Sequence, residues 1–202
     1  MTGPAPATTQ LLTTESIREL VRSECLRASN RFGPAFFDQH VLPVAAYGRQ
    51  LAAALDADAQ VVELAAYLHD LSAVRDLACV PTHHLESARI SSEILRERGW
   101  PERVVDAVCG CIRSHSAPVA PGHGTLEEVC VSNADVMAHL ARPAYWFFYL
   151  HGVRGLDLDE GLAWWQVRAE RAWSGLIEDA RMVVAAEHAA VLRFLQAAGP
   201  AR

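Results

Sequence analysis

The segment LAAYLHDLS, residues 64–72, carries the clearest structural signal in the 202-residue chain. It completes an apolar run that starts after Asp58, a residue type that suits the N-cap of a helix. Because the run is apolar on most faces, it predicts a central helix from Ala59 to about Asp70. His69 and Asp70 close this helix, and burying a carboxylate beside an imidazole costs free energy unless a partner neutralises it. A divalent metal is such a partner.

The rest of the chain also has the apolar spacing of helices, and no segment shows the sustained period-two alternation of strands. We therefore predict an all-α fold, a compact array of helices. The segments 71–82 and 117–124 are expected to be irregular, and Pro43 to lie in the first turns of its helix or to bend it. The predicted helices span approximately residues 13–28, 35–55, 59–70, 83–98, 101–114, 126–140, 157–180 and 182–198.

Composition limits the possible functions. Hydrophobic residues make up 51% and charged residues 21% of the chain, which is typical of a globular protein. The net charge of −6 argues against binding of a nucleic-acid polymer, which requires a basic face. A small anionic substrate stays compatible with this charge, because a bound metal supplies positive charge locally.

The N-terminal residues and the cysteines indicate the compartment of the protein. The segment MTGPAPATTQ lacks the basic start and apolar run of a signal peptide, and no stretch is long enough to span a membrane. Five cysteines without a regular framework predict reduced thiols. We expect a cytoplasmic protein without a membrane partner, in which residues 1–12 form a disordered tail.

Two further polar residues interrupt apolar helical patterns. His40 lies on the helix before the His69-Asp70 doublet, and a short connection places that helix antiparallel beside the central one. Asp135 lies within VSNADVMAHL, in the middle of another apolar helix. Each of these residues alone is more often a cap or a satisfied polar group. Together, two imidazoles and two carboxylates at one point favour manganese, iron, cobalt, nickel or zinc.

The order of these residues resembles the HD superfamily of metal-dependent phosphohydrolases, across roughly residues 36–140. Four blocks carry the resemblance: LAAYLHDLS (64–72), HHLESARISSEIL (83–95), GWPERVVDAVCGCIRSH (99–115) and TLEEVCVSNADVMAHL (125–140). It implies an HD-domain helical core, which we assign to residues 13–142. The extension over 143–202 matches the superfamily less clearly, and its apolar residues at helical spacing predict that it packs on the core or forms a homodimer contact. The resemblance also implies that one metal is bound by His40, His69, Asp70 and Asp135.

Members of this superfamily with a second metal have extra histidines on the two helices between the doublet and the last Asp. His83 stands four residues before Ser87, where such members place one of them, and His115 ends the following helix, as their other one does. His84 is an alternative to His83. The resemblance then implies one or two metal ions per chain, with Asp70 bridging the two if both sites are filled.

The chain also departs from the superfamily pattern. Many relatives have Gly-Lys shortly after the doublet, whereas this chain has LSAVR, so Arg75 is a candidate for holding a phosphate, or for pairing with Asp76. The absence of a Gly-Tyr-Pro motif argues against a cyclic-dinucleotide phosphodiesterase. The Trp164-Trp165 pair is interpreted as core or interface packing. Four histidines match no motif position and are interpreted as ordinary: His123, His139, His151 and His188.

The predicted function is hydrolysis of a small phosphorylated metabolite, a nucleotide or a related phosphate ester, with Asp70 as metal ligand and proton acceptor. The chain contains no Gly-x-Ser-x-Gly, phosphate loop or dinucleotide fingerprint that would supply another chemistry. One alternative is a di-iron oxygenase that cleaves a carbon–carbon or carbon–phosphorus bond, as some HD-like proteins do. Another is a binding or regulatory module that keeps the metal for folding alone.

Overall fold

The computed structural model describes residues 13–198, and every regular element in that part of the chain is helical. The all-α prediction is therefore confirmed, whereas the predicted tail at residues 1–12 lies outside the described residues. The α-helices are α1 (Thr14–Cys25), α2 (Leu42–Leu55), α3 (Ala59–Leu68), α4 (Leu71–Arg75), α5 (His83–Glu97), α6 (Glu102–Ser114), α7 (Leu126–Ala141), α8 (Pro143–Phe148), α9 (Leu158–Gly175) and α10 (Glu178–Ala198). The π-helices η1 (Phe37–Val41) and η3 (Tyr149–Val153) and the 3₁₀ helix η2 (Leu77–Thr82) connect them.

Both central helices begin at side-chain caps, of which the one at Asp58 was predicted above. The Asp58 carboxylate accepts hydrogen bonds from the backbone N–H groups of Gln60 and Val61, at 2.9 and 3.2 Å, and so starts α3. Thr125 and Glu128 form a capping box at the start of α7. α7 is apolar on most faces because it packs against α2, α3, α6 and α10. These contacts fix α3 and α7 at the centre of the fold.

The predicted helix over 35–55 is present as η1 followed directly by α2, and Pro43 stands in the first turn of α2, one of the two positions predicted for it. One local prediction was wrong. The segment 71–82, expected to be irregular, contains α4 and η2. These are five and six residues long, too short for the helical period to be recognised. Because α3 ends before the doublet, His69 and Asp70 lie in a turn between α3 and α4.

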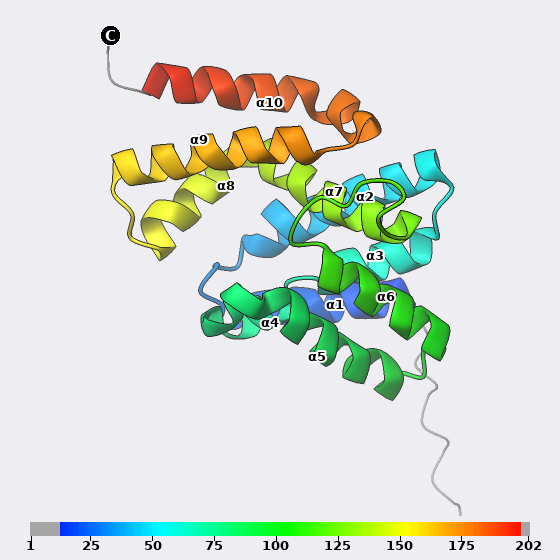
Figure 1. Ribbon diagram of the computed structural model, residues 1–202. Helices are drawn as coiled ribbons and strands as arrows, with labels where there is room; N and C mark the ends of the chain where they lie inside the picture. Colours follow the sequence, from blue (N-terminus) through cyan, green and yellow to red (C-terminus); the bar gives the residue numbers. More distant parts are fainter. Residues whose placement is uncertain (1–12, 199–202) are drawn as a thin grey trace, which may run out of the picture.

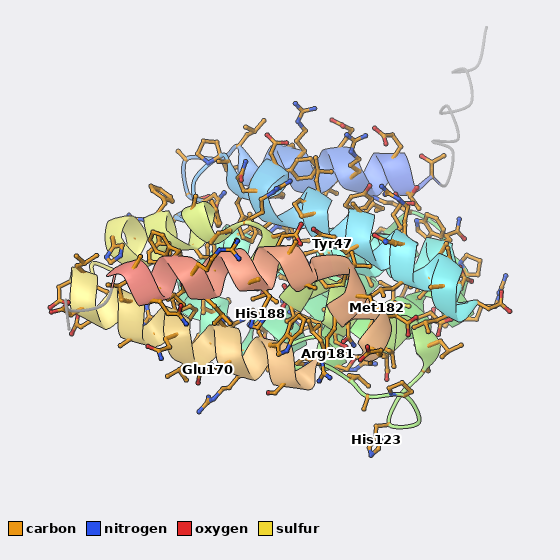
Figure 2. The ribbon with its side chains drawn as sticks, turned by 90° about the horizontal axis from the view of Figure 1, so that it is seen from above. Tyr47, His123, Glu170, Arg181, Met182 and His188 are labelled. Atoms are coloured by element: carbon orange, nitrogen blue, oxygen red, sulfur yellow. The ribbon has the colours of Figure 1, made fainter. Side chains whose placement is uncertain are left out.

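The C-terminal helices pack on the rest of the fold through α7. α10 contacts α2, α7 and α9, and α9 also contacts α7. In Figure 1, α9 and α10 lie across the top of the molecule, and Figure 2 shows them side by side over the other helices. Trp165 of α9 is only 1% exposed, so it anchors α9 on the apolar core. The C-terminal helices α9 and α10 therefore cover part of α7.

The helices of residues 13–198 are held together by packing rather than by covalent links. All five cysteines are free thiols, and four of them are buried: Cys25, Cys109, Cys111 and Cys130. Within these described residues, none of the helices combines the length and the apolar character that crossing a bilayer requires.

Gly48 sets how closely α2 approaches α3 and α7. A Cβ atom at this position would lie 2.9 Å from Cγ1 of Val62 and 3.8 Å from Cβ of Ala134. We expect Gly48→Leu to destabilise the protein by roughly 2–3 kcal/mol, because the larger side chain forces the helices apart. Ala53→Leu, on the exposed face of the same helix, is expected to change stability by less than about 0.5 kcal/mol. Urea unfolding measures both values, and equal midpoints for the two variants would contradict the prediction.

Candidate metal centre

The turn between α3 and α4 places Asp70 between two pairs of histidines. Its Oδ2 atom lies 3.4 Å from Nε2 of His40 and 3.2 Å from Nε2 of His69. Its Oδ1 atom lies 3.4 Å from Nε2 of His83 and 3.8 Å from Nε2 of His115. Within each pair the two Nε2 atoms are 3.0 Å apart. One carboxylate therefore faces both pairs, with one oxygen toward each.

Asp135 adds a second carboxylate to the first pair. From the middle of α7, its Oδ1 atom lies 3.3 Å from Nε2 of His40 and 3.8 Å from Nε2 of His69. His40 itself belongs to the π-helix η1, a type of element that is frequent at functional sites. The structure thus brings together all six residues that the sequence singled out as candidate ligands: His40, His69, Asp70, His83, His115 and Asp135.

Backbone hydrogen bonds fix the orientation of three of these imidazoles. The Nδ1–H groups of His69, His83 and His115 each donate to the carbonyl oxygen three residues earlier, at 2.8, 2.7 and 2.6 Å. This leaves Nε2 as the atom that faces Asp70. In metal sites a hydrogen bond of this kind fixes the tautomer and makes the other nitrogen a better ligand. His84, the alternative to His83, belongs to none of the candidate metal-binding groups among the described residues.

The spacing of the donor atoms fits transition-metal ions. Two nitrogens that are each about 2.1 Å from one metal, at a right angle, lie about 3.0 Å apart. The Nε2 atoms have this separation in both histidine pairs, and the nearest Asp70 oxygens lie slightly farther away. Mixed nitrogen and oxygen donors suit manganese, iron, cobalt, nickel and zinc. Each histidine pair, together with Asp70, could therefore hold one ion. These residues, with Asp135 beside the first pair, are called the His/Asp groups below.

The charge balance of the site also favours a cation. Burial alone would raise the pKa of Asp70 and Asp135, but the neighbouring histidines lower it well below the usual carboxyl range. Burial disfavours the charged form of His69 most strongly of the single effects, yet the carboxylates of Asp70 and Asp135 together outweigh it and raise the pKa of His69 to about 9. Burial and the charge of His69 lower the pKa of His115 to about 4. Both carboxylates, the buried one of Asp135 and the half-buried one of Asp70, thus stay ionised and attract positive charge.

His139, interpreted as ordinary from the sequence, lies in this site. Its Nδ1 atom is 2.8 Å from the backbone oxygen of Asp135 and 3.3 Å from its Oδ1 atom. The imidazole stacks on Trp146, with 4.0 Å between the ring centroids. A signal was present in the sequence, because residues four apart on an apolar helix share one face. The interpretation of His139 as an ordinary residue was therefore wrong.

Arg75, a candidate for phosphate binding, forms an ion pair elsewhere. Its Nη2 atom is 2.7 Å from Oε1 of Glu24 on α1. Asp76, the other partner considered, instead accepts a hydrogen bond from the backbone N–H of Ala78 at 2.9 Å. Arg75 does not line either of the cavities beside the His/Asp groups. Arg154 lines the cavity that contains Asp70, and nothing in the sequence pointed to it.

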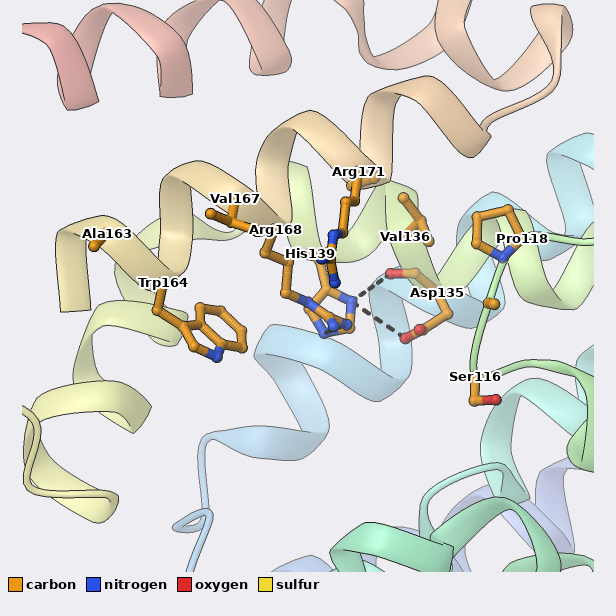
Figure 3. A pocket seen from close by; sticks show the side chains of 12 residues that line it. Ser116, Pro118, Asp135, Val136, His139, Ala163, Trp164, Val167, Arg168 and Arg171 are labelled. Carbon is orange, nitrogen blue, oxygen red and sulfur yellow. Dashed lines mark hydrogen bonds and ion pairs between the residues drawn. The ribbon is translucent and has the colours of Figure 1, made fainter. Parts of the chain in front are cut away.

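Two adjoining cavities open beside the His/Asp groups. The smaller, of about 220 Å³, includes Asp70, His83 and His115 in its walls. The larger, of about 650 Å³, is lined by α7, by α9 and by the loop that follows α6 (Figure 3). Trp165 of the tryptophan pair is fully buried in the core, as the sequence favoured, whereas Trp164 is partly buried against the core and also lines both cavities. The residues that line both cavities are Ser116, Asp135, His139, Trp164 and Arg168.

Comparison with known proteins places this geometry in a family. The model of the HD domain family matches residues 37–140, a little over half of the chain. Among solved structures, Bacillus subtilis YpgQ is 22% identical with a TM-score of 0.69, over 91% of each chain. The structure of YpgQ in complex with ADP is 20% identical with a TM-score of 0.65, over 91% of this chain and 94% of that one. A predicted HD superfamily hydrolase from an uncultured Thermotogales bacterium is 21% identical with a TM-score of 0.62, over 90% of this chain and 88% of that one.

The solved structures and the family model support different conclusions. No curated protein sequence matched the chain, and at these identities the solved structures show the fold alone. The family match is stronger, because residues 37–140 contain all six candidate ligands and His139. The resemblance seen in the sequence is thereby confirmed, and the chain belongs to the HD domain family.

Proposed function

We propose that the protein is a metal-dependent phosphohydrolase that acts on a small phosphorylated metabolite, a nucleotide or a related phosphate ester. The observation that supports this most is the position of Asp70, whose two carboxylate oxygens each face a pair of histidines. A second metal would share Asp70 with the first. In this proposal the first ion is held by His40, His69, Asp70 and Asp135, and the second by Asp70, His83 and His115.

The residues of the chain have separate tasks in this reaction. When bound, the metal supplies Lewis acidity toward a phosphoryl oxygen and lowers the pKa of a water molecule. Asp70 orients the attacking water by accepting its hydrogen bond, from a position between the two histidine pairs. Phe36 and Trp146 pack beside His40 and keep bulk water from its imidazole. Arg154, in place of Arg75, offers its guanidinium to the phosphoryl oxygens.

A structural relative and the cavity both support a nucleotide. YpgQ has been solved in complex with ADP, and it shares its fold with 91% of this chain. Here the smaller cavity combines the His/Asp groups with the aromatic side chains of Trp146, Tyr149 and Trp164. Trp164 also lines the larger cavity, where its ring suits contact with a planar base.

Metal reconstitution tests the proposal. The protein is stripped of metal and then reloaded separately with manganese, iron, cobalt, nickel or zinc. We expect phosphate release from nucleotides or other phosphate esters with at least one of these metals, and none from the stripped protein. Failure with every metal and every class of ester would contradict the proposal.

The second histidine pair supports one other candidate function. Because His83 and His115 provide donors for a second ion, a di-iron oxygenase that cleaves a carbon–carbon or carbon–phosphorus bond fits the same residues. Oxygen consumption by the iron-loaded protein distinguishes the two reactions. A stoichiometry of one metal per chain would count against the oxygenase.

A further inference from the structure

The two cavities differ in size in a way that bears on the substrate. Pockets that hold a drug-sized ligand typically measure about 300–1,000 Å³. The cavity beside Asp70, of about 220 Å³, is below this range, and the adjoining cavity, of about 650 Å³, is within it. A nucleotide-sized substrate therefore cannot lie in the smaller cavity alone. Its reacting group would occupy the smaller cavity, and the remainder would extend past Asp135 and His139 into the larger one.

The wall of the larger cavity carries two arginines from α9. Arg168 and Arg171 are three residues apart on this helix, and both side chains extend toward His139 (Figure 3). Asp135 is the sole acidic residue among the described residues that line this cavity, and it faces the histidines. In a chain with a net charge of −6, this wall is locally positive.

Arg168 is held in place without using its charge in an ion pair. Its Cζ atom lies 5.4 Å from the centroid of the Trp164 ring, and its Nη2 atom lies 3.3 Å from Nε2 of His139. His139 accepts this hydrogen bond through Nε2 because its Nδ1–H donates to Asp135. Within residues 13–198, neither Arg168 nor Arg171 forms a salt bridge with a carboxylate. Two guanidinium groups are thus left to bind an anion from the cavity.

We propose that this wall is a subsite for a second phosphoryl group of the substrate, bound by Arg168 and Arg171. The inference rests on the proposed function and deepens it. The substrate class becomes compounds with at least two phosphoryl groups, such as nucleoside diphosphates or triphosphates, in preference to simple monoesters. The planar guanidinium groups match the oxygens of a phosphoryl group, while the first phosphoryl group lies at the His/Asp groups.

The test measures binding rather than turnover, with two ligands that resist hydrolysis. Methylenediphosphonate carries two phosphonyl groups and methylphosphonate carries one. By titration calorimetry on the metal-loaded protein, we expect methylenediphosphonate to bind at least tenfold more tightly, which corresponds to about 1.4 kcal/mol. Arg168→Gln and Arg171→Gln are each expected to remove most of this difference and to leave methylphosphonate binding within about twofold. Arg193→Gln, at an exposed position on α10, is the matched control and should change neither affinity.

The outcomes separate this subsite from the hydrolase itself. Equal affinity of the wild-type protein for both ligands, or no binding of either, overturns the subsite. It is also overturned if the two variants weaken both ligands equally, because Arg168 would then act only by positioning His139. Arg171 is the sharper probe, since no hydrogen bond joins its side chain to any described residue in the fold. Phosphate release plays no part in these measurements, so a failure of the proposed reaction is recorded independently.

Discussion

Asp70→Asn is expected to reduce metal binding at both histidine pairs and to lower phosphate release by about 10³-fold or more. The aspartate presents one oxygen to His40 and His69 and the other to His83 and His115. Asparagine has one oxygen and one NH₂ group, so one pair would face a donor, and the negative charge is lost from both. Elemental analysis of the purified variant gives its metal content, and the most active ester of the panel gives its turnover.

Asp106→Asn is the matched control for this change. Asp106 is exposed on α6, and its substitution removes the same charge away from the site. We expect the control to keep its metal and its turnover. If Asp70→Asn also retained both, neither the hydrolase nor the oxygenase could use the arrangement described above. A thermal melt of both variants distinguishes loss of the metal from loss of the fold.

The central part of this site could be predicted because its polarity conflicts with its surroundings. His69 and Asp70 follow an apolar helix, and His40 and Asp135 interrupt apolar patterns on two others. A buried charge without a partner is costly, so such conflicts in a sequence mark positions where a partner must exist. The caps of the central helices were predictable for a related reason, because Asp58 contacts backbone groups only two and three residues away.

The outer part of the site depends on tertiary packing, which local patterns do not fix. Arg168 reaches His139 only because α9 folds back onto α7. Arg75 illustrates the opposite error, since its partner Glu24 lies 51 residues earlier in the chain. A charged side chain is long and flexible, so its partner is decided by which helix lies beside it. The residues that face the proposed metals could therefore be identified from the sequence more fully than those that line the substrate cavities.

Removal of the metal is expected to destabilise the protein, and more strongly as the pH rises. The pKa of His69 is about 9 in the folded, metal-free chain, against about 6.5 when unfolded. Its proton therefore stabilises the metal-free fold fully below about pH 6.5, and this contribution is lost as the pH rises to about 9. The pKa of His115, about 4, acts in the opposite direction, because stability is lost as the pH falls from about 6.5 toward 4. The Tm of the metal-free protein should thus be highest near pH 6.5.

A metal needs deprotonated His69, so its binding tightens over the range in which the proton is lost. At about 1,000 times its Kd, a metal adds about 4 kcal/mol, or roughly 10 °C in Tm for a chain of this length. Thermal melts with and without chelator should show the largest difference near pH 9. His69→Gln should reduce the alkaline decline of the metal-free protein without abolishing it, because Asp135 and Asp70 also raise the pKa of His40. His123→Gln, in an exposed loop (Figure 2), should leave the decline intact. If His69→Gln keeps the full decline as well, a group other than His69 holds the proton that a metal would replace.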